Sequence, residues 1–414
     1  MFALCYMQLR EFTFISPSME TGQVFKAIES AIPTALIDQV TAKNARRGQR
    51  QRKLPAHLVV CLVIAMSLWS KVAMRDVLKN LVDGMSVQWT RLSKYWKTPN
   101  SASITEARQR LGSQVMRQLF EQVVHPMATP ATPGAFLSGL RLMAIDGTLL
   151  DVPDSVANAK VFGYPGTRPG TKAAFPKVRL VMLIEAGTHL ITDALLCPYR
   201  MGERVRALKL LRSIQPRMLL MWDRGLHSFR MVAATVKQGG HYLGRVPANV
   251  KFEVEQVFSD GSYLSWIYPD RKSKKKGGTP LQVRVIEYTI ATYEQSEQVQ
   301  TYRLITSLLD LEQFPALLLA QEYHQRWEVE NTIDEVKTHL LGRKVPIRSL
   351  NPREVVQEIY GLLLGHWAVR TLMVQAAQHK GISPLRLSFT GTLQVLRRAI
   401  AKFQTASADE FPLF

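Results

Sequence analysis

The chain has 414 residues, of which 46% are hydrophobic, so it is long enough to bury the cores of two or three domains. Lys and Arg total 53 against 33 Asp and Glu, a net charge of +20 that favours a polyanionic partner, because each cation placed against a phosphate releases a counterion. A basic protein that binds no polyanion is the alternative. The three cysteines are too widely spaced for a metal-binding pattern, which excludes a cysteine-ligated zinc site and suits a cytoplasmic protein.

The N-terminal part of the chain is predicted to be helical. Residues 1–24 show no signal peptide and stay unassigned, whereas 25–125 contain several short helical patterns with basic faces. One of these patterns carries Arg108 and Arg110. We predict a helix-turn-helix-like DNA-binding domain in which these two arginines contact DNA, although an ordinary helical bundle fits equally well. The most apolar run, 58–69, is too short to cross a bilayer, so no membrane association is expected.

The residue pattern changes after a predicted linker at 126–137, which holds three prolines and a glycine. Apolar and β-branched segments then alternate with helical patterns in the order strand, hairpin, helix, strand, helix. This order favours a mixed α/β fold with a ribonuclease-H-like core, in which the first and fourth strands are adjacent. The predicted parts are a catalytic domain at 138–380, a β-rich insertion in it at about 248–310, and a C-terminal helical tail at 381–414.

Two aspartates end predicted strands. Asp146 closes an apolar strand and precedes Gly147, which leaves room for a ligand to approach, and Asp223 closes a second strand. A carboxylate at the end of a hydrophobic strand is costly unless it is solvated, paired or bound to a metal. Either aspartate alone is weak evidence, because such residues often cap the next turn.

A predicted helix at 312–341 carries a sharper pattern. Tyr323, Arg326, Glu330 and Lys337 have offsets of 0, 3, 7 and 14, which place them within an arc of about 60° on one helix face. A solvated face with ion pairs is the alternative interpretation. Asp334 lies one turn from Glu330 and stays a possible third acid, whereas the directions of other nearby acids, Glu328 and Glu335, disfavour them.

Together with the Ile-Asp-Gly-Thr around Asp146 and the Asp-Arg-Gly at Asp223, this Tyr-x2-Arg-x3-Glu-x6-Lys pattern resembles the DDE transposases of the insertion-sequence-four family over roughly 25–375. The resemblance implies that Asp146, Asp223 and Glu330 are the catalytic carboxylates. It also implies that Tyr323, Arg326 and Lys337 contact transposon-end DNA near the cut.

The cofactors implied by the resemblance are two Mg²⁺ or Mn²⁺ ions, with Asp146 bound to both and Asp223 and Glu330 each bound to one. Two such ions can activate a nucleophile and neutralise a leaving oxygen, and hard ions prefer carboxylate ligands. Hairpin-forming relatives carry a tryptophan on the last strand of the insertion, where this chain has Tyr302. Either Trp327 or Trp266 is then the candidate stacking partner for a flipped base, and a base held in a different way is the alternative.

The predicted function is cut-and-paste transposition by a homodimer on double-stranded DNA, at terminal inverted repeats and a target, in the cytoplasm at the bacterial nucleoid. Two alternatives remain at this point. One is a catalytically inactive derivative that acts as a DNA-binding repressor. The other is a metal-dependent nuclease of the same fold that does not transpose. Presence of all three carboxylates disfavours the first, and the Tyr-Arg-Glu-Lys pattern disfavours the second.

Overall fold

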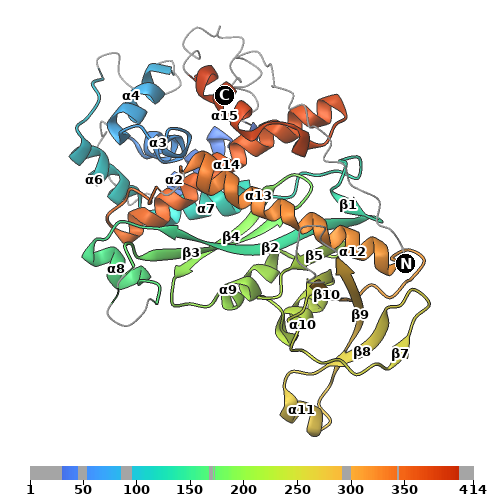
Figure 1. Ribbon diagram of the computed structural model, residues 1–414. Coiled ribbons are helices and arrows are strands. Elements are labelled where there is room, and N and C mark those ends of the chain that lie inside the picture. The colour runs from blue at the N-terminus through green and yellow to red at the C-terminus, as the bar shows by residue number, and fades with distance from the viewer. Residues whose placement is uncertain are drawn as a thin grey trace, which may run out of the picture.

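The computed structural model describes residues 30–44, 54–84, 96–166, 171, 173–290, 300–342 and 345–400 (Figure 1). The unassigned segment 1–24 and the C-terminal part of the predicted tail, 401–414, lie outside the described residues. Most of a basic stretch in the predicted DNA-binding domain, 45–53, does so as well.

A single mixed sheet forms the centre of the described structure (Figure 1). Its strands follow the order β4-β3-β2-β5-β6-β10-β9-β8-β7, and β1 pairs with β2 off this path. The strands are β1 (Phe136–Leu137), β2 (Leu140–Asp151), β3 (Lys177–Glu185), β4 (Leu190–Pro198), β5 (Met218–Trp222), β6 (His241–Arg245), β7 (Gln256–Val257), β8 (Tyr263–Ile267), β9 (Leu281–Ile290) and β10 (Gln300–Thr306).

The strand pairing confirms the predicted neighbours. β3 and β4 form an antiparallel hairpin, and β3 pairs antiparallel with β2. β2 pairs in parallel with β5, so the first and fourth strands of the predicted core are adjacent. The connection from β4 to β5 passes through a helix, as parallel strands require.

Side chains alternate between two hydrophobic cores, one on each face of the sheet. On β2, Ala144 packs into the core beneath the long helix α14 (Pro352–Lys380), and Ile145 packs into the core beside α9 (Glu203–Leu210) and α10 (Phe229–Lys237). Figure 1 shows α14 on one side of the sheet and α9 and α10 on the other. The near-continuous apolar runs in the sequence reflect burial on both faces.

The predicted β-rich insertion continues the central sheet rather than forming a separate one. β10 pairs antiparallel with β6, and β9, β8 and β7 follow outward, as the lower right of Figure 1 shows. A short helix, α11 (Arg271–Lys275), lies between β8 and β9. Because β10 pairs with β6, the insertion is held in a fixed position relative to the rest of the sheet.

The N-terminal helices pack against α14 in one continuous core (Figure 1). Gly361 of α14 permits close approach to α3, because a Cβ atom there would lie 2.6 Å from the Val63 carbonyl oxygen. The division into domains at 25–125 and 138–380 stays a prediction. The helices on this side are α2 (Thr34–Asn44), α3 (Ala56–Leu68), α4 (Met74–Gly84), α6 (Ser101–Leu111), α7 (Ser113–Val123) and, near the C-terminus, α15 (Phe389–Ile400).

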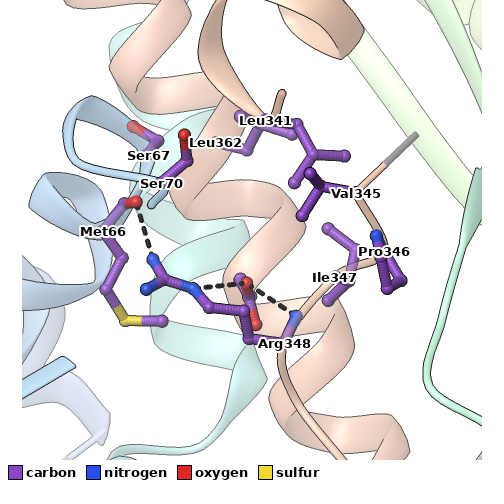
Figure 2. Close-up of a pocket in the computed structure, with 10 residues that line it drawn as sticks. Met66, Ser67, Ser70, Leu341, Val345, Pro346, Ile347, Arg348 and Leu362 are labelled. Carbon is purple, nitrogen blue, oxygen red and sulfur yellow. Dashed lines mark hydrogen bonds and ion pairs between the residues drawn. The ribbon is translucent and has the colours of Figure 1, made fainter. Parts of the chain in front are cut away.

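Arg348 joins α3 to α14 at a small cavity (Figure 2). Its guanidinium donates to the carbonyl oxygens of Met66 at 2.8 Å and Val72 at 2.6 Å, and its Nε lies 3.7 Å from a carboxylate oxygen of Glu358. One side chain thereby satisfies carbonyls at the end of a helix and a buried carboxylate on another.

The prediction of one regular helix at 312–341 is wrong, because the structure has four short helical pieces in this segment. The segment consists of α12 (Ala316–His324), a 3-10 turn at Gln325–Trp327, α13 (Glu328–Asp334) and a π-helix at Glu335–Leu340. The 3-10 turn and the π-helix change the rotation per residue, so the 60° arc expected from uniform spacing does not apply.

The remaining short helices are α8 (Val156–Phe162) and 3-10 turns at Leu211–Ser213 and Pro384–Arg386. Within the described residues, no helix has both the length and the apolar composition needed to span a membrane.

Candidate active site

Asp146 and Asp223 lie at the same level of neighbouring strands. Ala144 of β2 is paired with Met221 of β5, and both point into the core beneath α14. Two residues further along, the aspartates therefore come opposite each other, and by the alternation of a strand they point to the same side of the sheet. The predicted pair of carboxylates is thus brought together by strand register.

Local hydrogen bonds hold each aspartate. Asp146 Oδ1 accepts from the backbone N–H of Gly147 at 2.7 Å. Asp223 Oδ1 accepts from the N–H groups of Gly225 and Leu226 at 2.9 and 3.2 Å, which caps the turn after β5. One oxygen of Asp223 thus stabilises the turn, and these two hydrogen bonds fix the orientation of the carboxylate.

Arg326 connects Glu330 to Asp146. Its two terminal nitrogens lie 3.5 Å from Asp146 Oδ2 and 3.7 Å from Glu330 Oε1. The Arg326 side chain is 12% exposed, whereas that of Glu330 is 50% exposed and faces solvent. A guanidinium therefore stands between two of the three predicted catalytic carboxylates.

Burial raises the pKa of the Asp146 carboxyl to about 6. The Gly147 amide and the Arg326 guanidinium oppose this shift, and the neighbouring carboxylates of Glu203 and Asp223 add to it. An acid with this environment gains from a nearby cation, because burial and like charges both disfavour its ionised form.

Glu203 is a fourth carboxylate at this position, and the sequence analysis missed it. It begins α9, and its Oε2 accepts from Arg179 at 3.0 Å. A Cβ atom on Gly147 would lie 2.7 Å from the Glu203 Cδ atom, so the Glu203 carboxyl fills the space next to this glycine. The room that Gly147 was expected to leave for a ligand is therefore taken by a side chain. In the sequence, a glutamate in the first turn of a helix is an ordinary stabilising residue, and nothing marks it out.

Tyr323 lies inside the protein, and its predicted contact with DNA stays a prediction. The residue is 4% exposed, and its hydroxyl donates to the carbonyl oxygen of Trp222 at 3.2 Å. Burial raises its pKa to about 12, so the hydroxyl stays protonated as a donor. Tyr323 holds the end of β5 immediately before Asp223, and it thereby positions a carboxylate.

Arg108, the other predicted DNA contact with a buried position, joins two helices in the structure. It is 4% exposed, and its guanidinium donates to the side chains of Gln357 and Ser349, each at 2.9 Å. A helical arginine pattern cannot distinguish a basic surface from an arginine that joins two helices. Arg110, two positions along, is exposed and 3.8 Å from Glu106.

Lys337 and Trp327 occupy the same chain segment as Glu330. Lys337 is half-buried in the π-helix and forms no ion pair with the carboxylates of the described residues. Trp327 is 57% exposed in the 3-10 turn between Arg326 and Glu330. Trp266 is less exposed and lies on β8, in the insertion.

The competing acids have other partners. Asp334 Oδ1 accepts from Thr338 at 2.5 Å, and its other oxygen lies 3.4 Å from His339. Glu335 is buried against Arg370 and His366. Among the acids of this segment that the structure describes, Glu330 is the one that shares a guanidinium with Asp146.

Tyr302 belongs to an aromatic cluster at the base of the insertion. Its ring stacks on the Tyr288 ring with the two centroids 5.4 Å apart. The Arg245 Cζ atom lies over the Tyr302 ring, 4.1 Å from its centroid. His324 contacts both tyrosine rings edge-on. The faces of Tyr302 are therefore already in contact with other side chains.

The donor chemistry of the site suits a hard divalent cation. Asp146, Asp223, Glu330 and Glu203 supply carboxylate oxygens, which Mg²⁺ and Mn²⁺ prefer. Within the described part of the chain, no three acidic, histidine or cysteine side chains stand close enough together to enclose an ion. Arg326 now supplies positive charge at this position, so the residues fit the group by charge and chemistry, and an ion would replace that guanidinium.

Two family descriptions match the chain. Residues 23–121 match "Insertion element 4 transposase N-terminal", and residues 137–366 match "Transposase DDE domain". The second match spans the sheet, the insertion and the segment that carries Glu330.

Relatives from Escherichia coli K12 extend the match. The chain is 28% identical over 383 residues to "Transposase InsG for insertion sequence element IS4", covering 91% of this chain and 83% of that one. It is 27% identical to "Putative transposase InsZ" over 233 residues, or 56% and 75% of the two chains. A solved structure, the piggyBac transposase synaptic complex with hairpin DNA, is similar with a TM-score of 0.46 and 10% identity, over 93% of this chain and 82% of that chain. The chain belongs to the DDE transposase family and is a DNA transposase.

Proposed function

We propose that this transposase works by cut-and-paste: it cleaves DNA at the transposon ends and transfers the freed strands into a target. We assign the catalytic role to Asp146, Asp223 and Glu330 on a ribonuclease-H-like core preceded by an all-α DNA-binding domain. The observation that carries the proposal is Arg326, whose guanidinium lies 3.5 and 3.7 Å from Asp146 and Glu330. A cation is already held where the reaction requires positive charge.

The proposed cofactor is a pair of Mg²⁺ or Mn²⁺ ions. They supply activation of the attacking oxygen and neutralisation of the leaving oxygen. Asp146 lies between Asp223, its neighbour across the sheet, and Glu330, its neighbour through Arg326. We therefore assign Asp146 as the shared ligand, with Asp223 and Glu330 each completing one ion.

Cationic side chains would fix the register of the DNA. Arg326 cannot hold two carboxylates and a phosphate at once, so we propose that its guanidinium would pair with a phosphate beside the scissile bond once DNA is bound. Lys337, which is half-buried and unpaired among the described carboxylates, is a second phosphate ligand. Such contacts orient DNA without reading its sequence.

An exposed aromatic residue beside the carboxylates would hold an unstacked base. We favour Trp327 because it is 57% exposed and lies between Arg326 and Glu330 in the chain. Tyr302 is covered by Arg245 and Tyr288. A base stacked on an aromatic side chain gains roughly 1–3 kcal/mol.

The proposed partners are the terminal inverted repeats and the target, both double-stranded DNA, bound by a homodimer at the bacterial nucleoid in the cytoplasm. The net charge of +20 supports DNA binding. Arg110 supports a phosphate contact from the N-terminal helices, since its side chain is 42% exposed. Its ion pair with Glu106 is long, at 3.8 Å, and leaves the guanidinium accessible to a phosphate.

The test is cleavage of a labelled duplex that carries the element's own terminal repeat, with Mg²⁺ and with EDTA. We expect metal-dependent nicking at the repeat's end for the wild type and for Asp334→Asn, and at least a roughly hundredfold loss for Glu330→Gln. Persistent cleavage by Glu330→Gln would refute the assigned third carboxylate. Specific binding without any cleavage by the wild type would identify an inactive derivative, and cleavage without strand transfer would identify a nuclease.

A further inference from the structure

We propose that His189 is a positioning residue for Glu330. It lies in the turn between β3 and β4, and its ring stands between the carboxylates of Glu328 and Glu335, which flank Glu330 in the chain. The inference rests on the catalytic role proposed for Glu330 and adds a residue that the sequence analysis did not identify. Through these contacts the central sheet holds the helix that carries Glu330 in one orientation.

The two acids beside the His189 ring mark the ends of α13. Glu328 is the first residue of this helix, and Glu335 follows its last. At 100° per residue, Glu328 and Glu330 point about 160° apart around the axis of α13, so they lie on opposite faces. A contact that fixes the Glu328 face therefore also sets the direction in which Glu330 points.

The neighbours of the His189 ring determine which nitrogen carries its proton. Arg370 of α14 has no acceptor atom, and its Nη2 lies 2.6 Å from His189 Nδ1, so Nδ1 accepts. The proton is then on Nε2, which donates to Glu328 Oε2 at 3.1 Å. Glu335 takes its hydrogen bonds at this point from Arg370. The His189 ring thereby joins α14 to the first turn of α13.

The backbone of His189 is fixed to the sheet that carries Asp146. Its φ is +59°, in the left-handed region, and its N–H donates to the carbonyl oxygen of Glu185 at 2.9 Å. β3 ends at Glu185 and pairs with β2, where Asp146 is opposite Met182. His189 therefore ties α13 to the strand pair that contains Asp146, and the separation of Glu330 from Asp146 depends on this connection.

The experiment compares two amides at position 189. His189→Asn suits the left-handed backbone and can accept from Arg370, but its side chain is too short to donate to Glu328. His189→Gln is one methylene longer and returns an N–H to the place of Nε2. We expect His189→Asn to lower the single-turnover rate of cleavage at the transposon end roughly tenfold to a hundredfold with unchanged DNA affinity, and His189→Gln to recover most of that rate. His241→Asn on β6, whose ring lies 3.1 Å from Ser307 Oγ, is the matched control and should cleave as wild type.

Hydrogen–deuterium exchange of the free protein gives a second readout that needs neither metal nor DNA. Loss of a hydrogen bond to a charged group should make the amides of α13 exchange roughly tenfold faster in His189→Asn. The wild type, His189→Gln and His241→Asn should exchange alike in this helix. Faster exchange confined to α13 would tie the loss of rate to the orientation of this segment.

The outcomes distinguish this inference from the proposed function. Normal cleavage by His189→Asn, with cleavage lost in Glu330→Gln, would overturn the positioning role alone. Cleavage that survives Glu330→Gln would refute the catalytic assignment on which the inference rests. Equal losses of rate in His189→Asn and His189→Gln would also overturn the proposal, since the effect would then not pass through the donor to Glu328. Thermal melting checks folding, and Glu328→Ala, which removes the acceptor of the same hydrogen bond, repeats the test if His189→Asn fails to fold.

Discussion

Single atoms decide the shape of the acidic site. Gly147 has no Cβ, and the Glu203 carboxyl lies where that atom would be. The sequence alone indicated an open space at this glycine. A sequence shows that the glycine has no side chain, but it does not show that a side chain from another element fills the space. Tyr323 and Arg108 differ in another way, since their polar ends suggested DNA contacts and in the fold both make hydrogen bonds inside the protein.

Gly147→Ala should reduce cleavage about tenfold or more, because the new methyl group displaces the Glu203 carboxyl and overpacking costs about 1–3 kcal/mol. Gly202→Ala is the control, since a Cβ there would have no neighbour within 4 Å. Single-turnover cleavage and thermal melting would be measured for both. Equal activity of Gly147→Ala and wild type would show that the carboxyl moves aside without consequence.

Trp327→Ala should weaken the distortion of DNA at the transposon end. A 2-aminopurine base placed near the cut reports unstacking, and loss of a stacking partner worth roughly 1–3 kcal/mol should lower its fluorescence gain several-fold. Trp266→Ala, on the insertion, is expected to behave as wild type. The reverse ranking of the two variants would transfer the stacking role to Trp266.

Glu322 provides a pH test of stability. It is buried on α12, its Oε1 has no hydrogen-bond partner among the described residues, and burial raises its pKa to about 7. Between pH 4.5, near the unfolded value, and about 7, the folded state binds more protons than the unfolded state, so stability falls as pH rises. Glu322→Gln should therefore stabilise the protein by about 1–3 kcal/mol at pH 8 and little at pH 4.5, measured by urea unfolding. A pH-independent effect would mean that the pKa of Glu322 is the same in the folded and unfolded states, so that burial does not raise it.

At the scale of elements, the segment that carries Glu330 is a broken helix. A buried network anchors its π-helical part: Arg370 of α14 pairs with Glu335, and His189 and His366 contact the same carboxylate at 3.2 and 2.9 Å. His189 lies in the β3–β4 turn at a positive φ of 59°. Two other elements, α14 and the β3–β4 turn, therefore hold the end of this segment, which periodicity could not reveal.

Glu335→Gln should destabilise the protein by about 3–5 kcal/mol, because Arg370 would stay buried without its countercharge. Glu121→Gln, which breaks an exposed pair with Arg117, should cost about 1 kcal/mol or less. Denaturant unfolding would compare the two. Similar small losses in both variants would mean that Arg370 is not left without a compensating partner when Glu335 loses its charge.

At the scale of the whole molecule, helices from both ends of the chain share one core. Arg348 and Arg108 each bridge an N-terminal helix region and the segment that leads into or begins α14. The backbones of α3 and α14 approach each other closely at Gly361. The arrangement makes the N-terminal helices and the catalytic sheet mutually dependent.

Guanidinium unfolding should therefore show one transition, coincident by circular dichroism and tryptophan fluorescence. Arg348→Met should shift that whole transition by about 1–3 kcal/mol, since it removes the guanidinium that donates to the Met66 and Val72 carbonyls and that faces the Glu358 carboxylate. Arg353→Met, at an exposed position nearby, should not shift it. Two separate transitions would establish independent domains.

The sequence by itself determined which segments are strands and which apolar runs are buried, and it predicted three candidate carboxylates, because strand periodicity, apolar runs and motif spacing are local properties of a chain. The pairing register of β2 and β5, which the folded sheet supplies, places Asp146 opposite Asp223. Only the tertiary structure decided that Glu203 enters beside Gly147, that Arg326 bridges two acids, and that Tyr323 and Arg108 are internal. These outcomes depend on which distant side chain fills a given space, and close packing settles that competition only once the whole chain is folded.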